Sequence, residues 1–98
     1  MPYEITIKKR ANKDLNKFDH LNHEAAVSIS DRIKELSIDP YTPRPMMDIS
    51  PIAGSNPRKY RIRIGAQTRI EYTVDDLAHI VDVVDIIITK RRNTDYRI

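Results

Sequence analysis

The sequence predicts a single α+β domain over residues 1–98, in the order β-α-α-β-β-β, with an N-terminal helix hairpin packed on a mainly antiparallel four-stranded sheet. Apolar and polar residues alternate near the start of the chain and again after residue 58, which is typical of half-buried strands. Between these stretches, apolar residues recur every three or four positions, the period of an amphipathic helix. A chain of 98 residues can bury one sheet under one layer of helices, which excludes a two-domain enzyme.

The first strand is expected at about residues 3–8, where every second residue is apolar. The helix after it has its apolar positions four and three residues apart, at Ala11, Leu15 and Phe18. This spacing places the three side chains on one face of a short helix, with most of the basic residues elsewhere on it.

The second helix is expected over residues 22–37, and its apolar positions are Ala26, Ile29, Ile33 and Leu36. Asn22 is a suitable N-cap, and Glu24 lies near the positive end of the helix dipole. Pro40 disfavours helical geometry in the residue before it and so ends the helix. The two helices are expected to form an antiparallel hairpin joined at residues 19–21.

Residues 40–57 contain five of the six prolines and show no periodic pattern, so they predict a long irregular connection. Its apolar residues suggest that it packs over the core, at Met46, Met47, Ile49 and Ile52.

Alternation returns at residues 60–64 and 68–74, which predicts a β-hairpin with its turn at residues 65–67. Asp75 and Asp76 supply the next turn. Residues 79–88 are so rich in Val and Ile that they predict a central strand covered on much of both faces.

The net charge of +3 conceals blocks of opposite sign. Residues 57–72 hold five basic residues and one acidic residue, whereas residues 73–88 hold four aspartates and no basic residue. Residues 89–98 are basic again. Two basic blocks therefore flank an acidic one.

Alternation along the predicted hairpin places Arg61, Arg63 and Arg69 on one face of the sheet, away from the helices. Clustered guanidinium groups repel one another, and they suit the oxygens of an anionic partner such as an RNA or DNA phosphate. Asp82 and Asp85, three residues apart on one strand, are expected on opposite faces, so that only one can be a counter-ion. The alternative is a solvated face with ordinary ion pairs, such as Arg69 with Glu71.

Other chemistries have little support in the sequence. The chain has no cysteine, which excludes disulfides and thiolate zinc sites and favours a cytoplasmic location. The three histidines lack ligand-like spacing, so no metal or cofactor is expected. There is no long apolar run, and no membrane association is expected.

The order of elements, the segment YRIRIGAQTRIEY (residues 60–72) and the closing TKRRNTDYRI (residues 89–98) resemble the RelE/ParE superfamily of type II toxin-antitoxin toxins. The opening YEITIKKRANKDLNKF is also similar to that family's first strand and helix. The resemblance covers nearly the whole chain, is weakest over residues 40–57, and favours the RelE-like branch.

This resemblance implies a toxin that acts as an endoribonuclease, cutting mRNA on the ribosome without a metal by attack of a 2′-OH on the adjacent phosphate. It implies catalytic roles for Arg61, Arg63, Arg69, Arg92 and Tyr96, of which the tyrosine assists proton transfer. The RNA-binding residues would be Lys59, Lys90 and Arg91. The implied partners are a cognate antitoxin, the ribosome and mRNA, with operator DNA bound only through the antitoxin complex.

Two alternatives remain open from the sequence. One is a ParE-like inhibitor of DNA gyrase that cleaves nothing. The other is a catalytically inactive toxin-fold protein that serves as a binding module.

Overall fold

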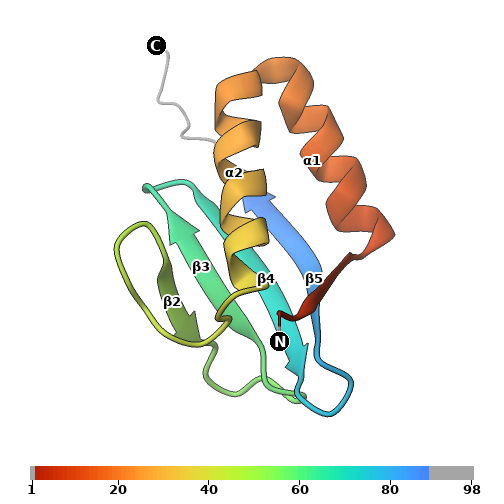
Figure 1. The fold of residues 1–98 in the computed structure, drawn as a ribbon. Coiled ribbons are helices and arrows are strands. Elements are labelled where there is room, and N and C mark those ends of the chain that lie inside the picture. The colour runs from red at the N-terminus through yellow and green to blue at the C-terminus, as the bar shows by residue number, and fades with distance from the viewer. Residues whose placement is uncertain (1, 89–98) are drawn as a thin grey trace.

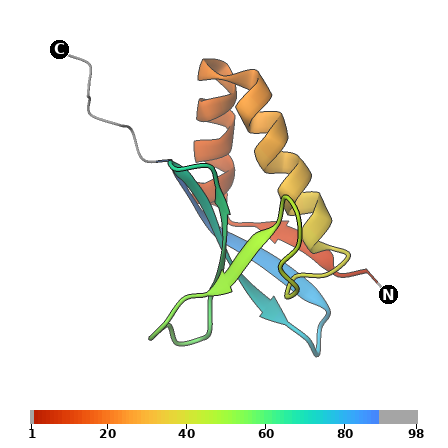
Figure 2. The same ribbon diagram turned by 90° about the vertical axis from the view of Figure 1, so that its left-hand side faces the viewer.

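The computed structural model describes residues 2–88, in which two helices cover one face of a five-stranded sheet and leave the other face bare (Figures 1 and 2). The elements are β1 (Glu4–Ile7), α1 (Lys9–Leu21), α2 (His23–Leu36), β2 (Asp48–Pro51), β3 (Tyr60–Ile64), β4 (Thr68–Asp75) and β5 (Ile80–Ile88). The predicted α+β class and helix hairpin are confirmed. The predicted strand count of four is wrong, because residues 2–88 contain five strands.

The strand order is β1-β5-β4-β3-β2. β1 runs parallel to β5, and the other three pairings are antiparallel. β5 is therefore an internal strand, as its run of Val and Ile predicts. The expectation that both of its faces are largely covered is wrong, because the two helices lie on one face of the sheet only. β3 and β4 form the expected hairpin.

The additional strand is β2, which lies within the proline-rich segment and pairs with β3 at the edge of the sheet. Pro51 ends this strand, at an edge position where a missing N–H is tolerated. Met47 and Ile49 are buried as expected, but Met46 is 70% exposed, contrary to the expectation that it packs. The strand has only four residues and lies among prolines, so no alternating pattern predicts it.

Asn22 alone separates the two helices, so the hairpin bends one residue later than predicted. Its side-chain oxygen accepts a hydrogen bond from the Ala25 N–H at 3.1 Å, which confirms its role as the N-cap of α2. No helix within residues 2–88 combines the length and apolar character that crossing a bilayer requires.

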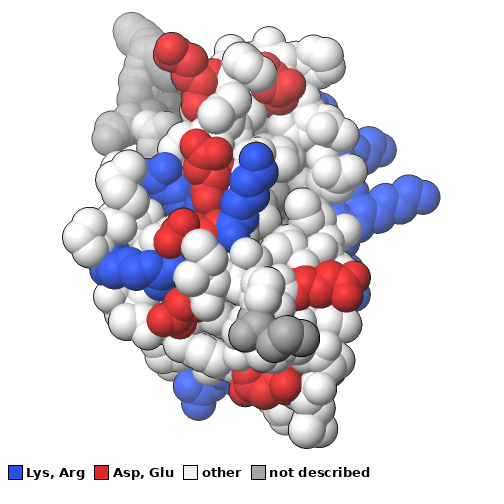
Figure 3. All heavy atoms as spheres, viewed as in Figure 1, with Lys and Arg blue, Asp and Glu red and all other residues white. Residues whose placement is uncertain are grey.

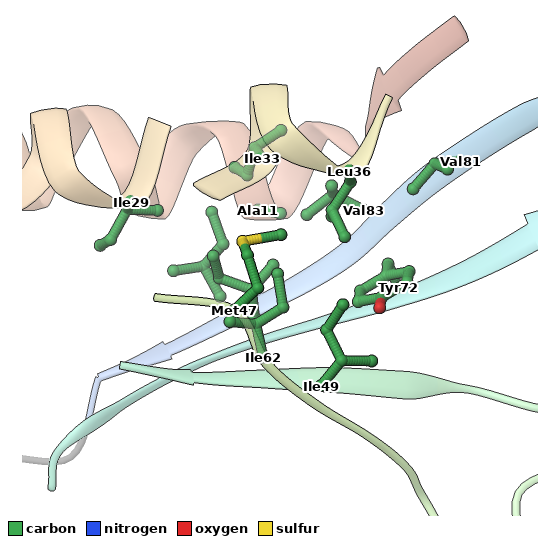
Figure 4. Packing of buried hydrophobic residues seen from close by; sticks show 12 residues of the cluster. Ala11, Ile29, Ile33, Leu36, Met47, Ile49, Ile62, Tyr72, Val81 and Val83 are labelled. Carbon is green, nitrogen blue, oxygen red and sulfur yellow. The ribbon is translucent and has the colours of Figure 1, made fainter. Parts of the chain in front are cut away.

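The core lies between the helices and the covered face of the sheet (Figure 4). Ile33 and Leu36 of α2 point toward Ile62 of β3 and Val83 of β5 in this layer. Tyr72 of β4 is fully buried, and its hydroxyl donates to the Pro40 carbonyl at 2.7 Å. That bond ties the start of the proline-rich segment to the centre of the sheet.

Candidate functional site

The bare face of the sheet carries the three arginines that the sequence singled out. Arg63 of β3 lies directly opposite Arg69 of β4, and Arg61 lies opposite Glu71. Ile62 and Ile70, the alternate residues of the same strands, are fully buried beneath the helices. The predicted shared face of Arg61, Arg63 and Arg69 is therefore present.

Arg63 and Arg69 border a shallow hollow of about 610 Å³ at one end of the sheet. The β3–β4 turn and Ile87 line the rest of it. Gly65 has a φ of +61°, a conformation that a residue without a Cβ adopts readily and that allows the tight turn. The hollow thus offers two guanidinium groups beside exposed turn backbone.

The three arginines differ in their ion pairs. Arg69 Nε lies 3.1 Å from Glu71 Oε2, the ion pair that the solvated-face alternative expected. Within residues 2–88, neither Arg61 nor Arg63 has a recorded ion pair or side-chain hydrogen bond. Two of the three guanidinium groups therefore remain available to an anionic ligand.

The prediction that Asp82 and Asp85 face opposite sides is wrong. Glu71 pairs with Asp85, and Tyr72 pairs with Val83, so Val84 is an extra residue in a β-bulge. The bulge brings Asp85 onto the same face as Asp82, which lies opposite Thr73.

Both aspartates are already paired with residues near the start of α1. Asp82 Oδ2 lies 3.1 Å from Lys8 Nζ, and Asp85 Oδ2 lies 3.2 Å from Arg10 Nη2. The bare face is therefore divided, with paired acids toward β5 and unpaired arginines on β3. The helix-covered face differs from it, because acidic side chains run over α2 with basic ones on either side (Figure 3).

Four of the predicted site residues lie outside the described residues: Lys90, Arg91, Arg92 and Tyr96. Ile88, the last described residue, pairs with Thr68 beside the hollow. Lys59 immediately precedes β3 and is half-buried. No group of three or more potential metal-ligating side chains occurs among residues 2–88.

A cluster at the opposite end of the sheet was not anticipated. Asp76 Oδ1 accepts hydrogen bonds from the hydroxyls of Tyr3 at 2.8 Å and Tyr41 at 2.9 Å. These bonds hold the pKa of Asp76 below its usual range, and the bond to Asp76 raises the pKa of Tyr3. Asp75 performs the predicted turn role, since its Oδ1 accepts from the Ala78 N–H at 3.0 Å.

The Asp76 cluster also stacks aromatic rings. The rings of Tyr3 and His79 are 3.9 Å apart and nearly parallel. Tyr41 meets Tyr60 edge to face at 5.4 Å. Because its polar groups bond to one another, this end of the sheet is a structural joint between three distant segments. The sequence does not predict that these residues lie in contact, because they are far apart along the chain.

A helix hairpin on one face of a mixed sheet is the architecture of the RelE/ParE superfamily of toxin-antitoxin toxins. The sequence profile of the family described as "ParE toxin of type II toxin-antitoxin system, parDE" matches residues 5–93, and the chain belongs to this family. It is therefore a toxin of a type II toxin-antitoxin system. Comparison of the sequence with curated proteins finds no match.

Solved structures share the fold. The archaeal RelE–RelB complex from Pyrococcus horikoshii superposes with a TM-score of 0.73 and 23% identity, covering 93% of this chain and 99% of the other. The YoeB dimer from Staphylococcus aureus gives a TM-score of 0.73 and 19% identity, covering 92% and 100% of the two chains. The YoeB/ParE toxin from Agrobacterium tumefaciens gives 0.73 and 16%, covering 89% and 99%. At these identities the likeness concerns the fold alone.

Proposed function

We propose that this toxin cleaves mRNA on the ribosome. The observation that carries the proposal is the pair of arginines at the hollow, where Arg63 of β3 lies directly opposite Arg69 of the adjacent strand. Arg61 lies two residues before Arg63, on the same face of β3. Like charges placed directly opposite destabilise a sheet. An anionic ligand such as an RNA phosphate would offset that cost when bound.

The reaction would be transfer of a phosphoryl group within the RNA chain. The 2′-oxygen forms a bond to the adjacent phosphorus, the bond to the 5′-oxygen of the next nucleotide breaks, and a 2′,3′-cyclic phosphate remains. Negative charge builds on the phosphate oxygens as the new bond forms. Guanidinium groups fixed on rigid strands stabilise that charge without rearranging, which is where most of the rate would originate.

Arginine is protonated at every relevant pH, so another group must accept the proton of the 2′-OH. Tyr96 is the candidate that the family resemblance supplies. Glu71 is a second candidate, since its carboxylate lies on the arginine face between Arg61 and Arg69. Its side chain is only 12% exposed and is paired with Arg69, so it would need to exchange that partner for the substrate hydroxyl.

The second candidate function is inhibition of DNA gyrase without cleavage, and the observation that favours it is the match to the ParE profile. The predicted RelE-like branch has no comparable support from that profile. In the gyrase alternative the arginine face would bind an acidic protein surface or DNA phosphates, and the chain would need no proton acceptor.

A cognate antitoxin is part of the proposal for either activity, because the family is defined by the toxin-antitoxin pair and the Pyrococcus relative is a RelE–RelB complex. Operator DNA would be bound only through that complex. The cytoplasm, where ribosomes and gyrase both reside, is the proposed location.

The test compares two assays on the same purified protein. Ribosomes carrying a defined mRNA are incubated with the chain and the 5′ ends of the products are mapped, while supercoiling by gyrase is measured in parallel. We expect cuts within the translated codons, and a loss of about 100-fold or more in rate for Arg63→Gln. Lys34→Gln, an exposed change on α2, is the matched control and should cut normally.

Intact mRNA together with blocked supercoiling would replace the proposal by the gyrase function. Neither activity, in a protein that still binds its antitoxin, would support the inactive binding module.

A further inference from the structure

A second site of unusual chemistry lies between α2 and the loop that precedes β2. It is a hollow of about 300 Å³ lined by Asp31, Arg32, Glu35, Pro45, Met46 and Met47. It lies on the helix side of the molecule, away from the arginine face, and none of its lining residues belongs to the proposed catalytic set.

The Arg32 guanidinium is fixed in this hollow but incompletely bonded. Nη1 donates to the Ser28 Oγ at 2.9 Å, and Nη2 approaches the Met46 sulfur at 3.7 Å. Nε is buried and has no hydrogen-bond partner among the described residues. A thioether sulfur is a weak acceptor, so this cation lacks strong acceptors on the side that faces Met46.

Met46 is held in an unfavourable backbone conformation beside that cation. The turn closes through two hydrogen bonds between Arg44 and Met47, from the Met47 N–H at 2.8 Å and from the Arg44 N–H at 3.1 Å. Pro45 at the second position and a φ of +70° at Met46 are features of a type II turn, in which glycine is usual at the third position. A methionine that keeps this strain at the surface is an outlier of the kind that marks functional positions.

The two neighbouring methionines differ sharply in access. Met46 is 70% exposed, whereas Met47 is 2% exposed and packs in the core. A peroxide in solution therefore has much freer access to Met46 than to Met47. The pair therefore provides its own internal control.

We propose that Met46 is a site of oxidation by peroxides, and that Arg32 binds the resulting sulfoxide. In this step the sulfur lone pair attacks one peroxide oxygen, the O–O bond breaks, and an S–O bond forms. Sulfur is oxidised by two electrons, and the second oxygen leaves as water after proton transfer. The product oxygen carries partial negative charge and is a strong acceptor for Nη2 and for the unsatisfied Nε. The inference does not depend on the proposed nuclease.

The expected consequence is that the oxidised loop remains docked on α2. Oxidation of a methionine that packs against apolar groups usually disrupts its contacts. Here the modified side chain would exchange a weak sulfur contact for a charge-assisted hydrogen bond. Methionine sulfoxide reductases would reverse the change, because Met46 is an exposed residue.

The test treats the full chain with hydrogen peroxide and follows each methionine by peptide mass mapping. We expect Met46 to gain one oxygen at least about ten times faster than Met47, as its greater exposure requires. The thermal midpoint is then compared before and after oxidation for the parent and for Arg32→Gln. The fall on oxidation should be larger in the variant, which lacks the guanidinium.

A second measurement keeps the test decisive if Arg32→Gln does not fold. The Arg32 Nε–H resonance should shift and exchange more slowly with solvent after oxidation, and Met46→Leu should abolish both changes. Equal oxidation rates at the two methionines would overturn the proposal. An Arg32 Nε–H resonance that does not change on oxidation would also overturn it. So would equal changes of the thermal midpoint in the parent and in Arg32→Gln.

Discussion

The two ends of the sheet use charge in opposite ways. At the β3–β4 turn, Arg63 and Arg69 face each other beside a hollow, and Arg63 has no recorded partner within residues 2–88. At the β4–β5 turn, Asp76 is bonded to both Tyr3 and Tyr41. The unpaired Arg63 lies where an anionic ligand is expected, whereas the hydrogen-bonded Asp76 holds distant segments of the chain together. The contrast separates a candidate binding end at the β3–β4 turn, the open end, from a structural end at the β4–β5 turn, the closed end.

The largest expected effect is loss of function at the open end. Arg63→Gln should reduce RNA cleavage by about 100-fold or more, because one fixed donor to the transition state is removed. Its circular dichroism spectrum should match that of the parent. Asp76→Asn is the paired change at the closed end and should cleave normally, and a comparable loss in that variant would contradict the division into two ends.

The next effect concerns the bond that holds the proline-rich segment to the sheet near the closed end. Tyr72→Phe removes the hydroxyl that donates to the Pro40 carbonyl and leaves that carbonyl without its buried donor. We expect a loss of about 1–3 kcal/mol in the free energy of unfolding, measured by urea denaturation. An unchanged denaturation midpoint would show that water or another donor replaces the hydroxyl.

The closed end should also respond to acid. The hydrogen bonds from Tyr3 and Tyr41 lower the pKa of Asp76 in the folded protein, so the unfolded chain binds its proton more readily. The contribution to stability is complete above the ordinary aspartate pKa of about 3.9 and is lost as the pH falls through the lower, folded-state value.

Thermal midpoints measured at decreasing pH, starting at about pH 6, test this expectation. The series begins well above the ordinary aspartate pKa of about 3.9 and continues below it. Asp76→Asn should flatten part of the decline. The remainder has another source in Asp39, whose pKa is lowered by hydrogen bonds from Thr42 and from the Tyr41 N–H. An identical decline in parent and variant would remove Asp76 from the explanation.

The smallest expected effect is a gain in stability at the open end. Arg63→Gln relieves the repulsion between Arg63 and Arg69, so the same change that impairs cleavage should stabilise the fold by about 0.5 kcal/mol at low salt. The gain should shrink as salt screens the charges. A loss of stability in this variant would mean that Arg63 has a structural partner.

Much of the fold follows from periodicity. Both helices, the β3–β4 hairpin and the internal position of β5 follow from the spacing of apolar residues, because those elements are long enough for a period to show. β2 was missed because Pro51 and its neighbours conceal a four-residue strand whose existence depends on pairing with β3.

The candidate site likewise has one part that the sequence predicts and another that it does not. The shared face of Arg61, Arg63 and Arg69 follows from alternation, since an antiparallel hairpin keeps opposed residues on one side. The side of Asp85 does not follow, because one extra residue in a bulge reverses the alternation beyond it. The Asp76 cluster unites residues more than thirty positions apart, which no local pattern can reveal.

The sequence by itself determined the class of fold and the arginine face, because these depend on residue type at fixed spacing along the chain. It indicated the family through the resemblance of its segments to those of known toxins. The tertiary structure alone decided which charges remain available. It paired Asp82 with Lys8 and Asp85 with Arg10, and left Arg61 and Arg63 without a recorded partner within residues 2–88. The physical reason is that an ion pair requires two side chains within a few ångströms, and that distance is set by how strands and helices pack.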